Sequence, residues 1–173
     1  SKQGRSGALV FVTVRHELRC NGSTEPALVE WHDIVYREAK KAGEADPAPT
    51  PAAAAQPGDW QHTIVPDDVL LFRYSALTFN GHRIHYDRKY VTEVEGYPGL
   101  VVHWPLIATL LLDLVRRNAP DAEVATFGFK ALRPLFDLHP FQIHGRRRGN
   151  AIKLWALNHE GGLSMDAQAT TRD

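Results

Sequence analysis

The sequence predicts an α+β fold in which antiparallel strands wrap around one long buried helix. Three observations support this prediction. Residues 8–18 and 27–37 are β-branched and partly alternating, residues 106–117 are apolar almost all round, and residues 124–170 alternate between strand-like runs and glycine-containing turns. With 173 residues, 43% of them apolar, the chain can bury one ordinary core. A long helix followed by a meander of antiparallel strands is typical of the α+β class.

The two N-terminal stretches are separated by Cys20-Asn21-Gly22-Ser23 and are expected to form a long β-hairpin. A two-stranded hairpin is marginally stable alone, so it should add to a larger sheet. From residue 40 to 59 the composition changes to alanine, proline and glycine without a large apolar side chain, which predicts a mobile linker.

The second region begins near residue 62. Residues 69–75 are predicted to form an apolar strand that leads into a polar turn, and residues 88–95 a short helix that ends at Gly96-Tyr97-Pro98-Gly99. Pro105 suits the first turn of the long helix at 106–117, and Arg116 and Arg117 suit its negative C-terminal end. Its leucines are expected in the core: Leu110, Leu111, Leu112 and Leu114. The expected strands are 124–132, 138–146, 150–159 and 163–170, with turns at 147–150 and 160–162.

Composition excludes some classes of function. The 20 basic and 20 acidic residues give a net charge of +0, which argues against broad electrostatic capture of nucleic acid. No apolar run approaches the roughly 20 residues needed to span a bilayer, so we expect a soluble protein without a membrane partner. The single Cys20 fits a reducing compartment, which predicts a cytoplasmic location, or the mitochondrial matrix in a eukaryote. The chain starts abruptly in a strand without Met, so we expect it to be a fragment.

The polar turn within residues 74–87 is the strongest functional candidate. Asn80 and His85 lie five residues apart on a loop between apolar segments, so they can be aimed at one point from a rigid base. His82 and His85 form a His-x-x-His pair, but no His-Glu-x-x-His helix or cysteine pair completes a metal site, so no metal is predicted. The alternative is that His85 only satisfies backbone groups in the turn.

Residues 79–87, followed by Glu95-Gly96-Tyr97-Pro98-Gly99-Leu100-Val101-Val102-His103, resemble the MaoC-like hotdog hydratases. Within them the chain is most similar to the mitochondrial-type 3-hydroxyacyl-thioester dehydratases and the mesaconyl-CoA and itaconyl-CoA hydratases. The resemblance is specific over residues 72–114. Members have two hotdog halves, of which the second carries the catalytic turn. The resemblance therefore implies three parts. Residues 1–39 are the closing hairpin of a first half that is largely missing, residues 40–61 are the linker, and residues 62–173 are the catalytic hotdog domain.

The resemblance also implies roles for single residues. Where (R)-specific enoyl-CoA hydratases carry an Asp and a His, this chain has Asn80 and His85. Because Asn cannot take up a proton, the resemblance implies that His85 is the acid–base group and that Asn80 orients water or thioester. Relatives read Val-His-Gly-Pro at the start of the central helix, whereas this chain has His103 and Trp104 before the proline. The Trp104 N–H can polarise a thioester carbonyl, but its indole projects where glycine permits close approach. Trp104, His103 and Gly81 are thus the expected oxyanion and substrate-binding residues, although His103 also suits a structural hydrogen-bonding role.

The implied activity is the reversible hydration of an enoyl thioester, carried by coenzyme A or an acyl carrier protein. No cofactor is expected beyond the coenzyme A of the substrate, and the chain should form a homodimer or pair with another hotdog half. Arg146, Arg147 and Arg148 could contact coenzyme A phosphates, or they could form a solvated hairpin turn. Two other classes stay open: a hotdog that binds an acyl thioester or partner chain without turnover, favoured by Trp104, and a thioesterase, which needs a carboxylate such as Glu93 or Glu95.

Overall fold

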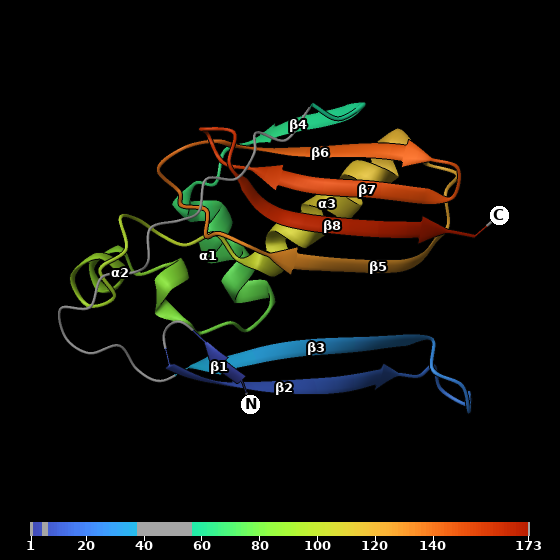
Figure 1. The fold of residues 1–173 in the computed structure, drawn as a ribbon, viewed down its shortest axis with the longest axis horizontal. Helices are drawn as coiled ribbons and strands as arrows, with labels where there is room; N and C mark the ends of the chain where they lie inside the picture. The colour runs from blue at the N-terminus through green and yellow to red at the C-terminus, as the bar shows by residue number, and fades with distance from the viewer. Residues whose placement is uncertain (1, 5–6, 38–56, 173) are drawn as a thin grey trace. The chain divides into compact units, whose positions relative to one another are not determined.

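The computed structural model describes residues 2–4, 7–37 and 57–172, and the chain divides into two compact units at residues 1–49 and 50–173 (Figure 1). Most of the predicted linker lies outside the described residues. The first unit is a three-stranded antiparallel sheet in the order β1-β2-β3, formed by Lys2–Gly4, Gly7–Leu18 and Leu28–Arg37.

The predicted N-terminal hairpin is confirmed. β2 pairs with β3 from Leu9 opposite Arg37 to Leu18 opposite Leu28, and Gly22 adopts a φ of 82° in the connecting turn. Large apolar side chains on this sheet are nevertheless exposed: Val10, Phe11, Val12, Trp31, Val35 and Tyr36. Successive residues of a strand point to opposite faces, so both faces carry exposed apolar side chains. That the hairpin adds to a larger sheet stays a prediction.

The second unit confirms the α+β class. Its five-stranded antiparallel sheet has the order β4-β6-β7-β8-β5, with bounds Trp60–Ile64, Phe141–Arg148, Ala151–Leu157, Leu163–Thr171 and Val124–Ala131. The long helix α3, Trp104–Asn118, crosses one face of this sheet (Figure 1). The core between them includes Ile107 and Leu111 of the helix and Leu154 and Met165 of the sheet, each with no exposed surface. Among the described residues, none of the helices is long and apolar enough to cross a membrane.

The helix α3 is buried on one face rather than all round. Its buried side chains are Leu106, Ile107, Ala108, Leu111, Leu114 and Val115. Leu110 is partly buried and packs against the core, whereas Leu112 is half-buried outside that cluster, so the expectation that all four leucines are core residues is too broad. Arg116 and Arg117 both pair with Asp113, and they lie in the last turn as predicted.

The predicted strand at 69–75 is wrong. These residues belong to helix α1, Asp68–Leu77, which Asp67 caps by accepting a hydrogen bond from the Leu70 N–H at 2.7 Å. The only buried residues of α1 are Leu71 and Ser75, four positions apart and therefore on one helical face. A continuous apolar run is typical of a strand that is buried on both faces. Here Phe72 is 60% exposed, so the run is not buried on a second side. The short helix predicted at 88–95 is confirmed as α2, Arg88–Glu93.

Candidate active site

The polar turn starts with a reversal of the chain after α1. Phe79 adopts a φ of 53°, in the left-handed region that non-glycine residues rarely occupy, and its side chain is 96% exposed. The Asn80 N–H donates to the Ser75 carbonyl at 2.9 Å, and Asn80 Oδ1 accepts from the His82 N–H at 3.0 Å. The Asn80 oxygen therefore shapes the turn, which leaves its amide NH2 as the group that can donate to a substrate or water.

His85 is the buried imidazole of this turn. It ends a short 3-10 helix, η1, Arg83–His85, and its side chain is 8% exposed. Nδ1 lies 2.7 Å from the Val101 carbonyl oxygen. Because a carbonyl can only accept, Nδ1 carries the proton of the neutral ring, and Nε2 is left with a free lone pair. The hydrogen bond thus selects the tautomer that can remove a proton from a substrate or water at Nε2.

The Val101 carbonyl is itself held in place from two directions. The Val101 N–H donates to the Ile84 carbonyl at 3.0 Å, next to His85 in the sequence. The preceding Leu100 N–H donates to Asp137 Oδ1 at 2.8 Å, and the Asp137 N–H returns a bond to the Leu100 carbonyl at 3.0 Å. The acceptor that orients His85 is therefore fixed to the turn on one side and to the 135–137 segment on the other.

A second imidazole covers one face of the first. His103, the residue before α3, stacks on His85 with ring centroids 3.7 Å apart and an angle of 16° between the planes. His103 is 1% exposed; its Nε2 lies 2.8 Å from Ser75 Oγ, and the Tyr74 ring contacts it edge-on at 4.9 Å. Its Nδ1 is buried without a hydrogen-bond partner among the described residues.

This environment disfavours the charged form of both rings. Burial lowers the pKa of His85, an effect that the Val101 carbonyl opposes and the neighbouring His82 reinforces. Burial, together with the nearby His85, lowers the pKa of His103 to about 4. Both imidazoles are therefore neutral at pH 7, as a base at Nε2 of His85 requires.

The buried His103 predicts a loss of stability in mild acid. Its folded pKa of about 4 lies below the unfolded value of 6.5, so the unfolded chain binds a proton first as the pH falls. The free energy of unfolding should drop by about 2–3 kcal/mol between pH 6.5 and pH 4 from this residue. Urea unfolding at both pH values measures the drop, and His103→Gln should reduce it. An equal drop in the variant would contradict the assignment.

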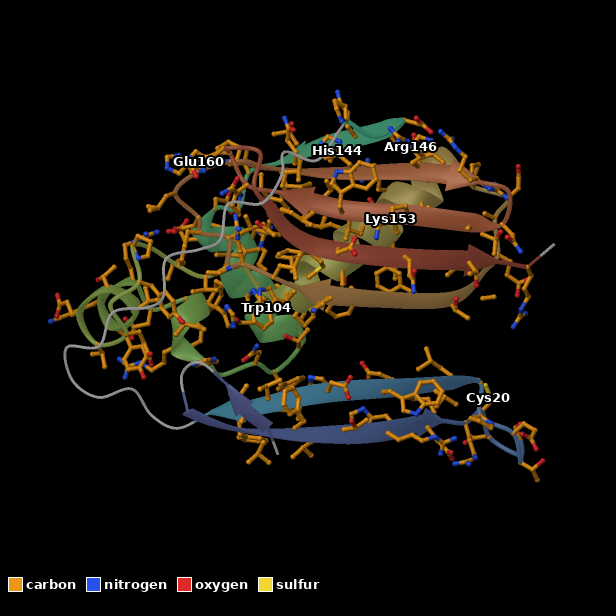
Figure 2. The ribbon with its side chains drawn as sticks, viewed as in Figure 1. Cys20, Trp104, His144, Arg146, Lys153 and Glu160 are labelled. Carbon is orange, nitrogen blue, oxygen red and sulfur yellow. The ribbon has the colours of Figure 1, made fainter. Side chains whose placement is uncertain are left out.

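The start of α3 adds unsatisfied donors beside the stacked rings. Among the described residues, the backbone N–H groups of Trp104 and Leu106 find no backbone acceptor, and the His103 side chain makes no capping hydrogen bond. The Trp104 side chain, labelled in Figure 2, is 46% exposed. The structure thus brings His85, His103 and the N-terminus of a 15-residue helix together, as the sequence suggested.

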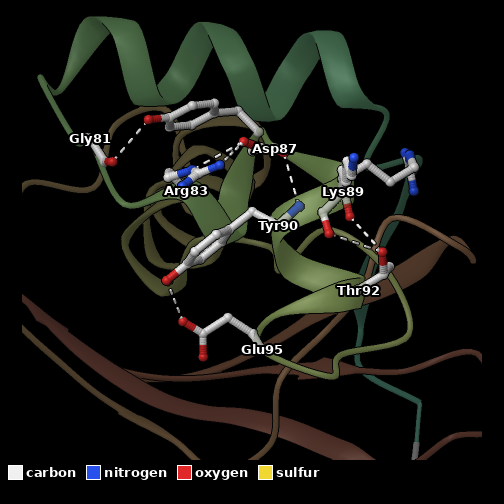
Figure 3. Close-up of polar contacts among 9 residues, drawn as sticks. Gly81, Arg83, Asp87, Lys89, Tyr90, Thr92 and Glu95 are labelled. Carbon is white, nitrogen blue, oxygen red and sulfur yellow. Dashed lines mark hydrogen bonds and ion pairs between the residues drawn. The ribbon is translucent and has the colours of Figure 1, made fainter.

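A network of side chains braces the turn from its outer side (Figure 3). Asp87 accepts two hydrogen bonds from Arg83, at 3.0 and 2.7 Å, and caps α2 by accepting from the Tyr90 N–H at 3.0 Å. The Arg83 guanidinium lies 4.1 Å from the Tyr90 ring centroid, and the Tyr90 hydroxyl donates to Glu95 at 2.8 Å. Glu95 is therefore hydrogen-bonded to a residue of α2. Neither Glu95 nor Glu93 is hydrogen-bonded to an imidazole of the site.

Other residues predicted for the site have different surroundings. Gly81 is exposed, and a Cβ added at this position would meet no atom within 4 Å. Its carbonyl accepts from the Tyr86 hydroxyl at 2.9 Å, so it closes the turn. His82 contacts His85 edge-on at 5.6 Å. Among the described residues, no group of three or more metal-binding side chains is found.

The three arginines lie at the end of β6, whereas Trp104 lies near the opposite end of the sheet in Figure 2. Arg146 donates to the Pro57 carbonyl at 2.8 Å and lies 3.4 Å from Asp59, which Arg148 also contacts at 3.1 Å. Arg147 donates to the Gly149 carbonyl at 2.9 Å. The structure does not bring them to the turn, and their contact with coenzyme A phosphates stays a prediction.

Sequence reasoning missed Ser75, Tyr74 and the Val101 carbonyl. Ser75 was assigned to a strand, which hid the four-residue spacing that places it on the buried face with Leu71. If residues 68–77 are assigned to a helix capped by Asp67, the spacing predicts that the Ser75 hydroxyl points to the buried side. The Val101 carbonyl carries no sequence signal, because every residue has one.

Comparison with known proteins supports the resemblance found in the sequence. Residues 1–137 match the family model described as hydroxyacyl-thioester dehydratase type 2. The chain is 47% identical over 172 residues to mesaconyl-C(4)-CoA hydratase of Chloroflexus aurantiacus, covering 96% of the chain and 58% of that protein. It is 39% identical over 99 residues to the mitochondrial hydroxyacyl-thioester dehydratase type 2 of Schizosaccharomyces pombe, covering 55% of the chain and 32% of that protein.

Among solved structures, the (R)-hydratase of A. caviae involved in PHA biosynthesis matches with a TM-score of 0.59 at 14% identity, covering 70% of this chain and 98% of that one. At this identity the likeness shows the fold alone, and the predicted hotdog fold is confirmed. The chain spans less than two thirds of the length of either curated relative. The family match, which extends over most of the chain, shows that this protein belongs to the hydroxyacyl-thioester dehydratase type 2 family.

Proposed function

We propose that this chain carries the catalytic half of a hydro-lyase that reversibly adds water to an enoyl thioester. The observation that carries the proposal is the 2.7 Å contact between Nδ1 of His85 and the Val101 carbonyl. It leaves a buried, neutral imidazole with Nε2 free, near a helix N-terminus whose first N–H groups are unsatisfied among the described residues.

In hydration, Nε2 of His85 removes a proton from a water molecule held by the Asn80 amide, and the oxygen of that water bonds to Cβ of the substrate. The electron pair of the double bond moves toward the thioester carbonyl, whose oxygen gains negative charge. The Trp104 N–H stabilises that charge at the start of α3. The imidazolium then returns its proton to Cα, and Nδ1 keeps its bond to Val101 throughout. Dehydration follows the same steps in reverse.

The relatives' names support a proposal for the substrate class. We propose an acyl-CoA with a short, unsaturated acyl group, such as mesaconyl-CoA, itaconyl-CoA or a similar thioester, as the C. aurantiacus relative's name suggests. An acyl carrier protein is the alternative carrier. No cofactor takes part in the proposed steps, since coenzyme A enters only as part of the substrate.

The N-terminal unit suits a second part of the proposal. Its sheet exposes large apolar side chains on both faces, so it is suited to pack against further parts of a hotdog half. We propose that residues 1–39 close a first hotdog half, that 62–173 form the catalytic half, and that the protein works as a homodimer or with another hotdog half. The proposed location is the cytoplasm, or the mitochondrial matrix in a eukaryote.

A panel of crotonyl-CoA, mesaconyl-CoA and itaconyl-CoA tests the reaction. We expect loss of the enoyl absorbance and a hydrated product without release of free coenzyme A. Free coenzyme A would indicate a thioesterase, a reading that the hydrogen bond of Glu95 to the Tyr90 hydroxyl does not favour. Binding of the thioesters with neither product would overturn the hydro-lyase proposal. It would favour a binding module, which the Trp104 side chain at the helix start supports.

The proposal also predicts a pH profile. His85 must be neutral to act as the base, and its pKa is lowered by burial. The value of kcat/KM in the hydration direction should therefore stay level as the pH falls to about 6.5 and then fall about tenfold per pH unit below the His85 pKa. A profile that already falls between pH 8 and pH 7 would contradict a neutral, buried His85 as the base.

A further inference from the structure

Ser75 and His103 form a buried pair that supports one face of the proposed base. Ser75 lies on α1 and is 5% exposed, and its hydroxyl is 2.8 Å from Nε2 of His103. His103 in turn stacks on His85 at a centroid distance of 3.7 Å. Because its Nδ1 has no partner among the described residues, the contact with Ser75 is the one hydrogen bond in that part of the chain that fixes the His103 ring.

We propose that Ser75 and His103 are positioning residues that hold the His85 imidazole in the plane from which Nε2 faces the substrate. This inference rests on the proposed function, because it assigns these residues to the same reaction. His85 has a hydrogen bond at one edge, to Val101, which still allows the ring to tilt about that bond. A flat ring held against its face removes the tilt, so the hydrogen bond and the stack together define the direction of Nε2.

The stack also keeps water from one face of His85. The groups that face His85 are His82 on its own turn, edge-on at 5.6 Å, and His103 from the start of α3, with Tyr74 of α1 behind His103. No carboxylate is hydrogen-bonded to either stacked ring among the described residues. Loosening His103 should therefore hydrate His85 and move its pKa up toward the ordinary value of 6.5.

The variant Ser75→Ala tests the pair, with Ser164→Ala as its matched control. Ser164 is also a buried serine, 1% exposed, and its hydroxyl has no hydrogen-bond partner among the described residues. Ser75→Ala should lower kcat for hydration about five- to tenfold and leave KM within about twofold of the wild type. The orientation of the base affects proton transfer in the transition state and not the binding of the substrate. The acidic limb of its kcat/KM profile should move to higher pH, whereas Ser164→Ala should change neither.

A titration of the His85 ring by NMR decides the proposal independently of turnover. The His85 resonance is assigned by its loss in His85→Ala, and its pKa should rise by about half a pH unit or more in Ser75→Ala. Either an unchanged His85 pKa or a kcat within about twofold of the wild type would overturn the positioning role. If the wild type hydrates no thioester, the proposed function fails, while the titration still shows whether Ser75 and His103 control His85.

Discussion

Replacing His85 with alanine is expected to lower the rate of enoyl-CoA hydration by about 10²–10⁴-fold, the range that general acid–base catalysis contributes. The same ring removes the proton from water and returns it to Cα, so no step of the proposed reaction survives its loss. Asn80 cannot replace it, because a carboxamide does not take up a proton at neutral pH and its oxygen is engaged with the His82 N–H. The measurement is kcat/KM on the most reactive thioester of the panel.

A matched control separates the base from a buried histidine in general. His144 on β6 is 2% exposed and stacks on Trp155 at 5.5 Å, away from the turn. His144→Ala should lower the melting temperature but leave kcat per folded molecule within about threefold of the wild type. Substantial turnover by His85→Ala, or an equal loss in His144→Ala, would sink the assignment of His85 as the base.

Replacing Trp104 with glycine is expected to raise kcat/KM for branched enoyl-CoA substrates. The backbone N–H of this residue is the proposed donor to the thioester carbonyl, and it persists in any variant other than proline. In the proposed mode of binding, the indole adds bulk beside the position that the carbonyl takes up. If crowding costs about 1–3 kcal/mol there, as overpacking does in protein cores, its removal raises kcat/KM roughly 5- to 150-fold.

The series Trp104→Phe and Trp104→Gly distinguishes bulk from other effects of the indole. Activity should rise in the order Trp, Phe, Gly, even though glycine costs up to about 1 kcal/mol of helix stability, which the melting temperature records. A fall in kcat/KM along the series would show that the indole contacts the substrate favourably. The N-terminus of α3 would then be an acyl-binding surface rather than a crowded one.

Much of the fold could be predicted from local patterns, and the exceptions have physical causes. The hairpin and the four C-terminal strands follow from β-branched runs between glycine turns, and α3 follows from an apolar run too long for a strand. The pattern of residues 69–75 predicts a strand wrongly, because a short apolar run has no decisive period. The information that settles it lies outside the run, in the carboxylate of Asp67, which caps the helix.

The candidate site was predictable in its residues but not in its geometry. Asn80 and His85 are predicted because they lie within one polar turn, whereas His103 and Trp104 are predicted from the family resemblance at the start of the helix. The stacking of His85 on His103 joins positions 18 residues apart through the tertiary fold, and no spacing rule encodes it. Ser75 acts on His103 from a third element, so its role became visible only once α1 was placed.

The bond from His85 to a backbone carbonyl has a consequence for the choice of substrate. A base oriented by Asp or Glu would place a fixed negative charge beside the acyl group, whereas a carbonyl oxygen carries only a partial charge. Among the described residues, no carboxylate is hydrogen-bonded to either stacked imidazole. A thioester whose acyl chain ends in its own carboxylate can therefore approach Nε2 without meeting an ion of the same sign in that hydrogen-bonding shell.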